Sequence, residues 1–163
     1  MARTYVKLGT TTLTSAQLVV TFSSIPSTYT DLVVIYSGSS VTSGQSLDVR
    51  LNSDTGTNYS FTGLYGDGST ASSFKVTSST YGRIANFTTS IGNAIAYFQN
   101  YANTNINKTW LSRSNSAGAD VIAFTNLWRS TAAISSISFS NFGNSVNIAS
   151  GSTFTLYGIK AEV

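Results

Sequence analysis

The segment Gly151-Ser-Thr-Phe-Thr-Leu-Tyr-Gly-Ile159 decides the fold that we expect for this chain. Gly151 suits a turn because glycine tolerates backbone angles that other residues avoid. The residues after it are mostly β-branched, aromatic or aliphatic, which is typical of a β-strand. Alternation along a strand places Phe154 and Leu156 on one face and Tyr157 on the other. Only four residues follow Ile159, so the segment predicts a closing strand that lies inside a sheet.

Further strand patterns precede this segment along the whole chain. The clearest is the alternation of Leu47, Val49 and Leu51 with polar residues, which predicts a strand with one dry and one wet face. The continuous apolar run 31–37 predicts a strand that is buried on both faces. Weaker strand patterns occupy residues 18–25, 59–64, 74–76, 94–101, 108–113, 121–129 and 133–139, and residues 81–87 are ambiguous.

These patterns predict an all-β protein that consists of one antiparallel sandwich or barrel. About eight to ten short strands are separated by turns at the spacing typical of such folds. No segment has a sustained helical stripe, which argues against a parallel α/β fold. We expect an N-terminal arm over residues 1–10 and a β-sandwich domain over residues 11–163. The arm contains Tyr5, Val6 and Leu8, and our hypothesis is that it pairs with the exposed edge strand of a neighbouring subunit.

The composition limits the classes of partner and compartment. Only 9% of the residues are charged and 41% are hydrophobic, which does not fit a disordered chain. The net charge of +3 comes from scattered cations without a basic cluster, so we expect neither a nucleic-acid surface nor a membrane surface. There is no Cys, no signal-peptide pattern and no apolar run long enough to span a bilayer. The sequence therefore predicts a protein made in the cytoplasm that folds without disulfides.

The chain lacks the residues that most catalytic and metal sites need. Without His or Cys, a Ser-His-Asp triad, a thiol nucleophile and a zinc site are excluded or nearly so. Asp54 and Asp67 are the only pair of carboxylates that suggests a glycosidase, and we favour a turn-capping role for each. Residues 54–58 superficially resemble a calcium loop but supply too few oxygen ligands. We predict no enzyme activity, no cofactor and no metal.

Tyrosines in or near loops are the best candidates for contacts with a partner. A ring with one polar end suits stacking on a sugar or packing between subunits, although packing in the core is the more common role. Trp110 and Trp128 lie within predicted strands, where core packing is expected, and Arg129 faces the side opposite Trp128. The tyrosines in question are Tyr5, Tyr29, Tyr59, Tyr65, Tyr81 and Tyr101. The residues that we select as candidate partner contacts are Tyr5, Val6, Leu8, Tyr59, Tyr65 and Arg129.

Four segments, taken in order, resemble a β-sandwich domain that recurs in virion structural proteins of tailed bacteriophages, notably cyanophages. Each segment alone is a weak signal, but the ordered set spans the chain from about Leu18 to Ile159. The segments are Tyr29-Thr-Asp-Leu-Val-Val34, Leu51-Asn-Ser-Asp-Thr-Gly-Thr-Asn-Tyr-Ser60, Leu127-Trp-Arg-Ser-Thr-Ala-Ala-Ile134 and Gly151-Ser-Thr-Phe-Thr-Leu-Tyr-Gly-Ile159.

The resemblance implies a jelly-roll-like sandwich and a structural role on the surface of the virion. The first role that it implies is that of a capsid decoration, or cement, protein. Such a protein would form a homotrimer and bind the major capsid protein. The alternative is the receptor- or carbohydrate-binding tip of a head or tail fibre, with a glycan as partner. The resemblance supplies no catalytic residue.

Overall fold

The computed structural model describes residues 4–116 and 120–160, and they form an all-β protein. Among these described residues, no helix is long and apolar enough to cross a membrane. The strands are β1 (Tyr5–Thr12), β2 (Val20–Phe22), β3 (Asp31–Gly38), β4 (Gln45–Leu51), β5 (Tyr59–Gly66), β6 (Ala71–Ser79), β7 (Gly82–Phe87), β8 (Gly92–Phe98), β9 (Lys108–Ser116), β10 (Asp120–Trp128), β11 (Ile137–Ser140) and β12 (Thr153–Ile159).

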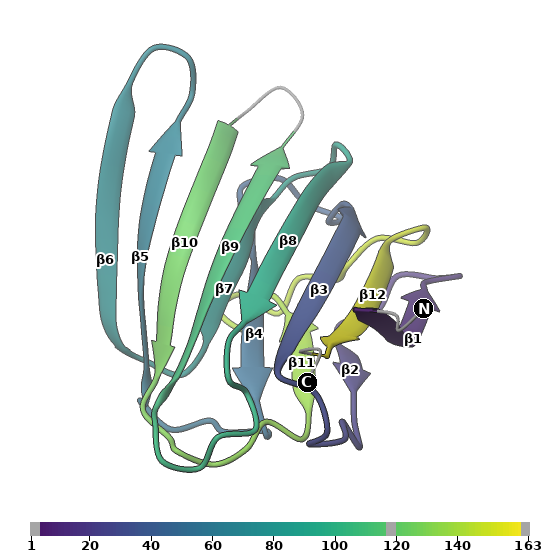
Figure 1. Ribbon diagram of the computed structural model, residues 1–163. Coiled ribbons are helices and arrows are strands. Elements are labelled where there is room, and N and C mark those ends of the chain that lie inside the picture. The colour runs from purple at the N-terminus through teal and green to yellow at the C-terminus, as the bar shows by residue number, and fades with distance from the viewer. Residues whose placement is uncertain (1–3, 117–119, 161–163) are drawn as a thin grey trace.

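The strands form two antiparallel sheets of unequal size that pack face to face (Figure 1). The large sheet has eight strands in the order β1-β12-β3-β8-β9-β10-β5-β6, and the small sheet has four in the order β2-β11-β4-β7. The strands β1-β12-β3-β8 of the large sheet and all of the small sheet together have the pairing order of an eight-stranded jelly roll. The predicted antiparallel, jelly-roll-like sandwich is therefore confirmed.

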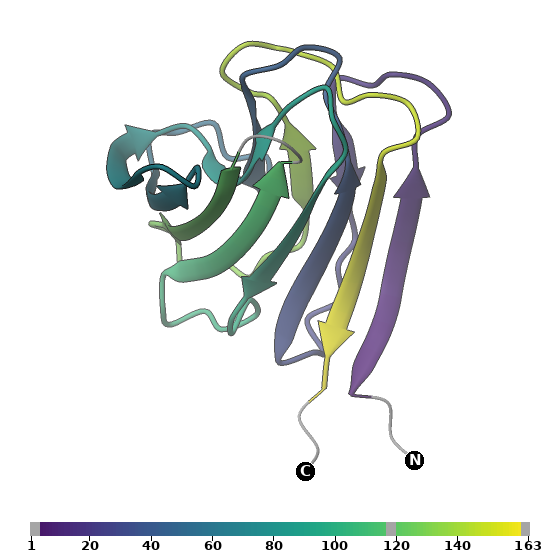
Figure 2. The same ribbon diagram turned by 90° about the horizontal axis from the view of Figure 1, so that it is seen from above.

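The other four strands extend one sheet beyond the jelly roll. β9 and β10 pair with each other, β10 pairs with β5, and β5 pairs with β6. The extended sheet curls at the β6 end, as the view from above shows (Figure 2). Under the curl lies a second apolar cluster, formed by Phe61, Ile122 and Phe124 and covered by Phe74 and Val76.

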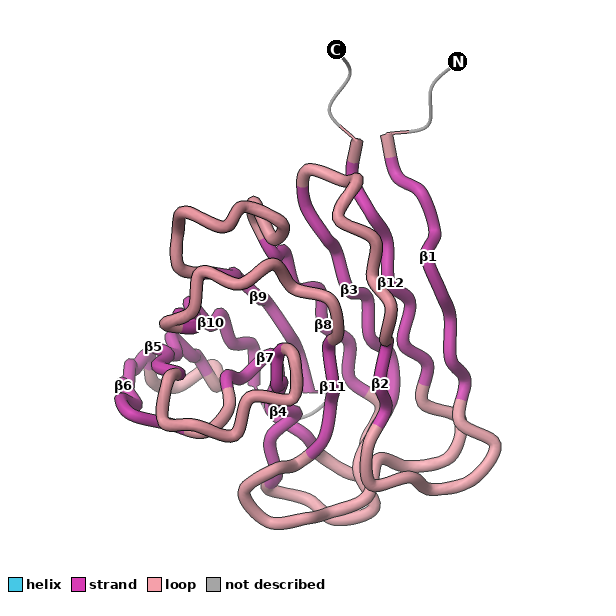
Figure 3. The backbone as a smooth tube through the Cα atoms, turned by 90° about the horizontal axis from the view of Figure 1, so that it is seen from below, coloured by secondary structure: helices cyan, strands magenta, loops and turns pink. Residues whose placement is uncertain are grey.

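The main core fills the space between the two sheets. Its largest side chains include Trp110, Phe98 and Phe139, all of which are almost fully buried. β12 lies between β1 and β3, as the closing segment predicted, with Phe154 and Leu156 in the core. β1 begins and β12 ends at the same end of the sheet (Figure 3).

The sequence underestimated how many strands form. The structure contains twelve strands among its described residues, rather than eight to ten. The pattern at 74–76 suggested a short strand at best. β6 instead covers nine residues, because it pairs with β5 along almost its whole length. The ambiguous segment 81–87 forms β7. The expected boundary between an arm and a domain, after residue 10, falls inside β1.

Two predicted burial patterns were wrong in detail. Leu47, Val49 and Leu51 form the dry face of β4, but Asp48 on the opposite face is also fully buried. Arg83 and the backbone of Phe142 cover it. β3 was expected to be buried on both faces. Val33 on its outer face is buried as expected, but Ile35 on the same face is well exposed because no element covers it there.

Candidate docking face

The outer face of the eight-stranded sheet carries the exposed apolar side chains that best fit a docking site. In β3, β9 and β10, the residues on one face are buried in the core while alternate residues point away from it. Four outward side chains are large, apolar and strongly exposed: Ile35 (43%), Leu111 (50%), Leu64 (60%) and Val121 (66%). We call this surface the docking face.

The strand register brings residues from distant parts of the chain into lateral rows on the docking face. One row runs across five strands, because cross-strand partners on the same face lie side by side. Its members are Ile35, Ile95, Arg113, Ala123 and Leu64. The adjacent row contains Tyr157, Val33, Tyr97 and Leu111. Val33 itself is almost fully buried, and the exposed members of the two rows form a largely apolar surface around Arg113.

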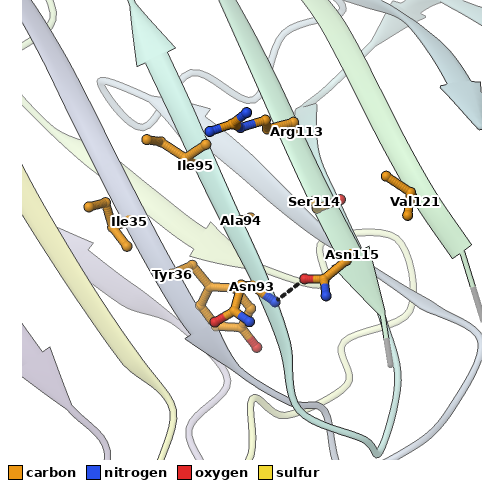
Figure 4. A pocket seen from close by; sticks show the side chains of 9 residues that line it. All are labelled: Ile35, Tyr36, Asn93, Ala94, Ile95, Arg113, Ser114, Asn115 and Val121. Carbon is orange, nitrogen blue, oxygen red and sulfur yellow. Dashed lines mark hydrogen bonds between the residues drawn. The ribbon is translucent and has the colours of Figure 1, made fainter. Parts of the chain in front are cut away.

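A shallow depression of about 370 Å³ lies in the docking face (Figure 4). Ile35, Ile95 and Val121 line it together with Arg113. At one end, the amide N–H of Asn93 donates to the side-chain oxygen of Asn115 (3.0 Å), so the polar rim is held in place. The depression is hollow enough to accept a protruding side chain of a partner.

The charges on the docking face are mostly positive. Among the described residues, Lys7, Lys75 and Arg113 lie on this face, from β1, β6 and β9. Asp31 lies at its margin, where its carboxylate accepts a hydrogen bond from the amide of Asn100 (2.7 Å). A largely apolar partner surface with a carboxylate opposite Arg113 and further carboxylates at its rim complements this distribution.

The candidate contact residues of the N-terminal segment lie in β1 at one edge of the large sheet. Tyr5 is half exposed and packs edge-on against Tyr157 at 6.3 Å, while Val6 and Leu8 are partly buried. One side of β1 pairs with β12 of the same chain. Its other side pairs with no described strand and is open to another β-strand.

Of the other candidate contact residues, Tyr59 corrects the expectation. Tyr59 is fully buried, where its hydroxyl accepts a hydrogen bond from the amide of Leu51 (3.0 Å), so it has no surface to offer a partner. Tyr65 is half-buried against the second apolar cluster. Arg129 is exposed and its guanidinium donates to the hydroxyl of Ser60 (3.0 Å).

The two carboxylates considered for glycosidase chemistry are turn caps, as we favoured. Asp54 accepts hydrogen bonds from the amide of Gly56 (2.7 Å), the side chain of Asn58 (2.9 Å) and the indole of Trp128 (2.6 Å). Asp67 accepts from the amides of Ser69 (2.9 Å) and Thr70 (2.8 Å). Burial raises the pKa of Asp54, but its hydrogen bonds together lower this pKa below the usual range. Hydrogen bonds also hold the pKa of Asp67 below the usual range. Within the described residues, no group of acidic side chains is placed to hold a metal ion.

Asp48 is a carboxylate with a raised pKa. It is fully buried on the outer face of β4, and this burial raises its pKa to about 6. Two contacts lower the pKa of Asp48, but by less than burial raises it. The guanidinium of Arg83 and the amide of Phe142 each donate a hydrogen bond to the Asp48 carboxylate at 3.2 Å. Its protonation is therefore coupled to folding at mildly acidic pH.

We predict that the free energy of unfolding decreases as the pH rises from about 4 to about 6. In this window the folded state binds a proton at Asp48 that the unfolded state has already lost, so deprotonation destabilises the fold by up to about 3 kcal/mol. His is absent from the sequence, so no other side chain of ordinary pKa titrates near the top of this window. Urea unfolding at pH 4.5 and pH 7 measures the difference.

Asp48→Asn removes this dependence, whereas Asp67→Asn retains it, because Asp67 titrates below the window. A wild-type stability that is equal or higher at pH 7 than at pH 4.5 contradicts the assignment.

Comparisons with known proteins do not place the chain in a family. No family model matches it, and no curated protein does. Among solved structures, a protein of unknown function from Shewanella oneidensis MR-1 is weakly similar, with 11% identity and a TM-score of 0.25. The match covers 86% of this chain and 64% of that protein. A similarity this weak carries no argument about function.

Proposed function

We propose that this protein is a capsid decoration, or cement, protein of a tailed bacteriophage, located on the outer surface of the virion. Its role is to bind the assembled shell of the major capsid protein and to stabilise it. The observation that carries this proposal is the docking face: a broad, uncovered, apolar sheet surface with a depression around Arg113. The resemblance of four sequence segments to phage virion domains supports the same role.

The docking face fits a protein partner that differs from this chain. Exposed apolar patches on this scale mark interaction sites in soluble proteins. A second copy that used the same face would bring Arg113, Lys7 and Lys75 against the same cations of the first copy, which disfavours that pairing. A largely apolar capsid surface with carboxylates opposite Arg113 and at its rim has no such conflict.

Stabilisation of the shell follows from linkage. A protein that binds the assembled shell and not the free subunits lowers the free energy of the assembled state only. The interaction therefore needs no catalytic group, and many shallow contacts on a sheet are sufficient.

Self-association as a homotrimer forms part of the proposal. The open side of β1 is the surface that we assign to it, because unpaired backbone groups there accept a strand from a neighbouring subunit. Tyr5 and Val6 lie on this strand. The docking face stays free for the shell in such an arrangement.

The copy number in purified particles of the phage that encodes the chain tests the proposal. We expect hundreds of copies, measured by quantitative mass spectrometry against the major capsid protein, with regular density over the shell in an electron cryo-microscopy reconstruction. Tens of copies confined to a fibre support the alternative, a receptor- or carbohydrate-binding tip. Absence from the particles overturns both.

A further inference from the structure

A second cavity of about 430 Å³ lies away from the docking face. Its polar lining comes from β4, β7, the start of β10 and the loop after β11, and includes Gln45, Ser46, Arg83, Asn86, Asp120 and Asn144. Ser46 and Asn86 pair across the outer face of the small sheet. Asp120 aligns with the inward residues of β10, so the cavity and the docking face lie on opposite sides of the large sheet.

The cavity contains polar groups whose hydrogen-bonding capacity is not used. One oxygen of Asp120 accepts from the side chain of Asn86 (2.5 Å), while its other oxygen, Oδ1, is buried and has no hydrogen-bond partner among the described residues. A buried carboxylate oxygen without a donor is costly, and a rotation of the Asp120 carboxylate toward the cavity would let an incoming hydroxyl group satisfy it. Asp120 therefore favours a ligand that has several hydrogen-bond donors.

Arg83 supplies donors to the same cavity. Its Nε donates to Asp48 (3.2 Å), and its guanidinium lies 5.1 Å from the centre of the Phe61 ring, which fixes its orientation. Neither terminal nitrogen of this guanidinium forms a hydrogen bond to a described residue. A preoriented guanidinium loses little entropy when it binds an acceptor.

The charge balance of the cavity selects against anions. The charge of Arg83 is opposed by Asp48, its ion-pair partner, and Asp120 adds a second carboxylate. An entering phosphate or carboxylate would meet this second negative charge at short range. A neutral ligand that both donates and accepts hydrogen bonds meets no such repulsion.

We propose that this cavity binds a neutral saccharide through adjacent hydroxyl groups, which donate to the carboxylate of Asp120 and accept from the guanidinium of Arg83. Asn86 and Asn144 supply further amide groups at the wall. The site remains open when the docking face is occupied, so a particle-bound copy presents it to the surrounding medium. The inference concerns this cavity alone and does not depend on the capsid role.

The test is an NMR titration of the ¹⁵N-labelled protein with methyl glycosides of mannose, galactose and glucose, N-acetylglucosamine and inorganic phosphate. We expect at least one neutral saccharide to bind in the millimolar range and to shift the Arg83 Nε–H and Asn86 side-chain signals. Phosphate should leave those signals unchanged. Asp120→Asn removes the acceptor and should weaken saccharide binding at least about ten-fold.

Matched variants separate this site from the docking face. Asn144→Ala, at an exposed wall position, should weaken saccharide binding even if Asp120→Asn perturbs the fold. Arg113→Ala should leave saccharide binding unchanged, and Asp120→Asn should leave binding to capsids unchanged. The proposal is overturned if no neutral saccharide shifts the cavity signals up to about 50 mM, if phosphate binds as well as the saccharides, or if both cavity variants bind like wild type.

Discussion

Trp110→Ala is expected to lower the free energy of unfolding by about 3–5 kcal/mol, the range for removing a large aromatic side chain from a core. The Trp110 ring is almost fully buried and stacks on Phe98 with the ring centroids 5.4 Å apart. Its edge fills the space above Gly82, where an added Cβ would lie only 2.1 Å from the Trp110 ring. Urea unfolding measures the loss.

The adjacent residue is a matched control for Trp110. Leu111 lies on the opposite face of the same strand and is half exposed. Leu111→Ala should therefore change the free energy of unfolding by less than about 0.5 kcal/mol. Equal losses for the two variants would mean that β9 is shifted by one residue, because such a shift exchanges the two faces of a strand.

Leu111→Asp is expected to weaken binding to capsids that lack the decoration protein by about a hundred-fold. Leu111 lies in the apolar rows of the docking face next to Tyr97, so an interface there would bury an unpaired carboxylate, at a cost of about 2–3 kcal/mol. Binding is measured by co-sedimentation of the full chain with shells purified from a phage deletion mutant.

The control for this prediction separates folding from docking. Because Leu111 is exposed in the free protein, Leu111→Asp should keep the wild-type thermal unfolding temperature within a few degrees. Arg113→Glu should also weaken capsid binding, since it reverses the charge at the centre of the face. Wild-type binding by both variants would rule out this face as the capsid contact and would leave the saccharide cavity unaffected.

Most of the fold could be predicted from the sequence, because the local sequence patterns agree with the tertiary structure. The alternation in β4 and the segment 153–159 each identify a strand and its inward face, and both are confirmed. β6 was underestimated because its outward residues are mostly Ser, Thr and Ala, and only its pairing with β5 stabilises it as a strand. Local patterns do not report such partners.

The candidate site was harder to predict for the same reason. Ile35, Ile95 and Leu111 are separate alternating residues in the sequence, and only the register shows that they form neighbouring rows. Tyr59 was chosen for its ring and its loop-like surroundings, but its hydroxyl bonds to the backbone of Leu51 inside the core. Whether a tyrosine faces outward depends on contacts in the folded structure that the local sequence pattern does not report.

The unequal size of the two sheets divides the molecule into parts of different local stability. The small sheet also packs on β9 and β10 through β7, and Tyr59 at the start of β5 lies in the main core, whereas β6 and the rest of β5 pack on the small second cluster. Opening only the part of that hairpin beyond Phe61 leaves Tyr59 in the main core, so it requires less free energy than global unfolding. Leu64 lies on the hairpin and on the docking face, so a partner bound there also holds the hairpin closed. Docking at Leu64 therefore adds contacts to a part of the sheet that the small sheet does not cover.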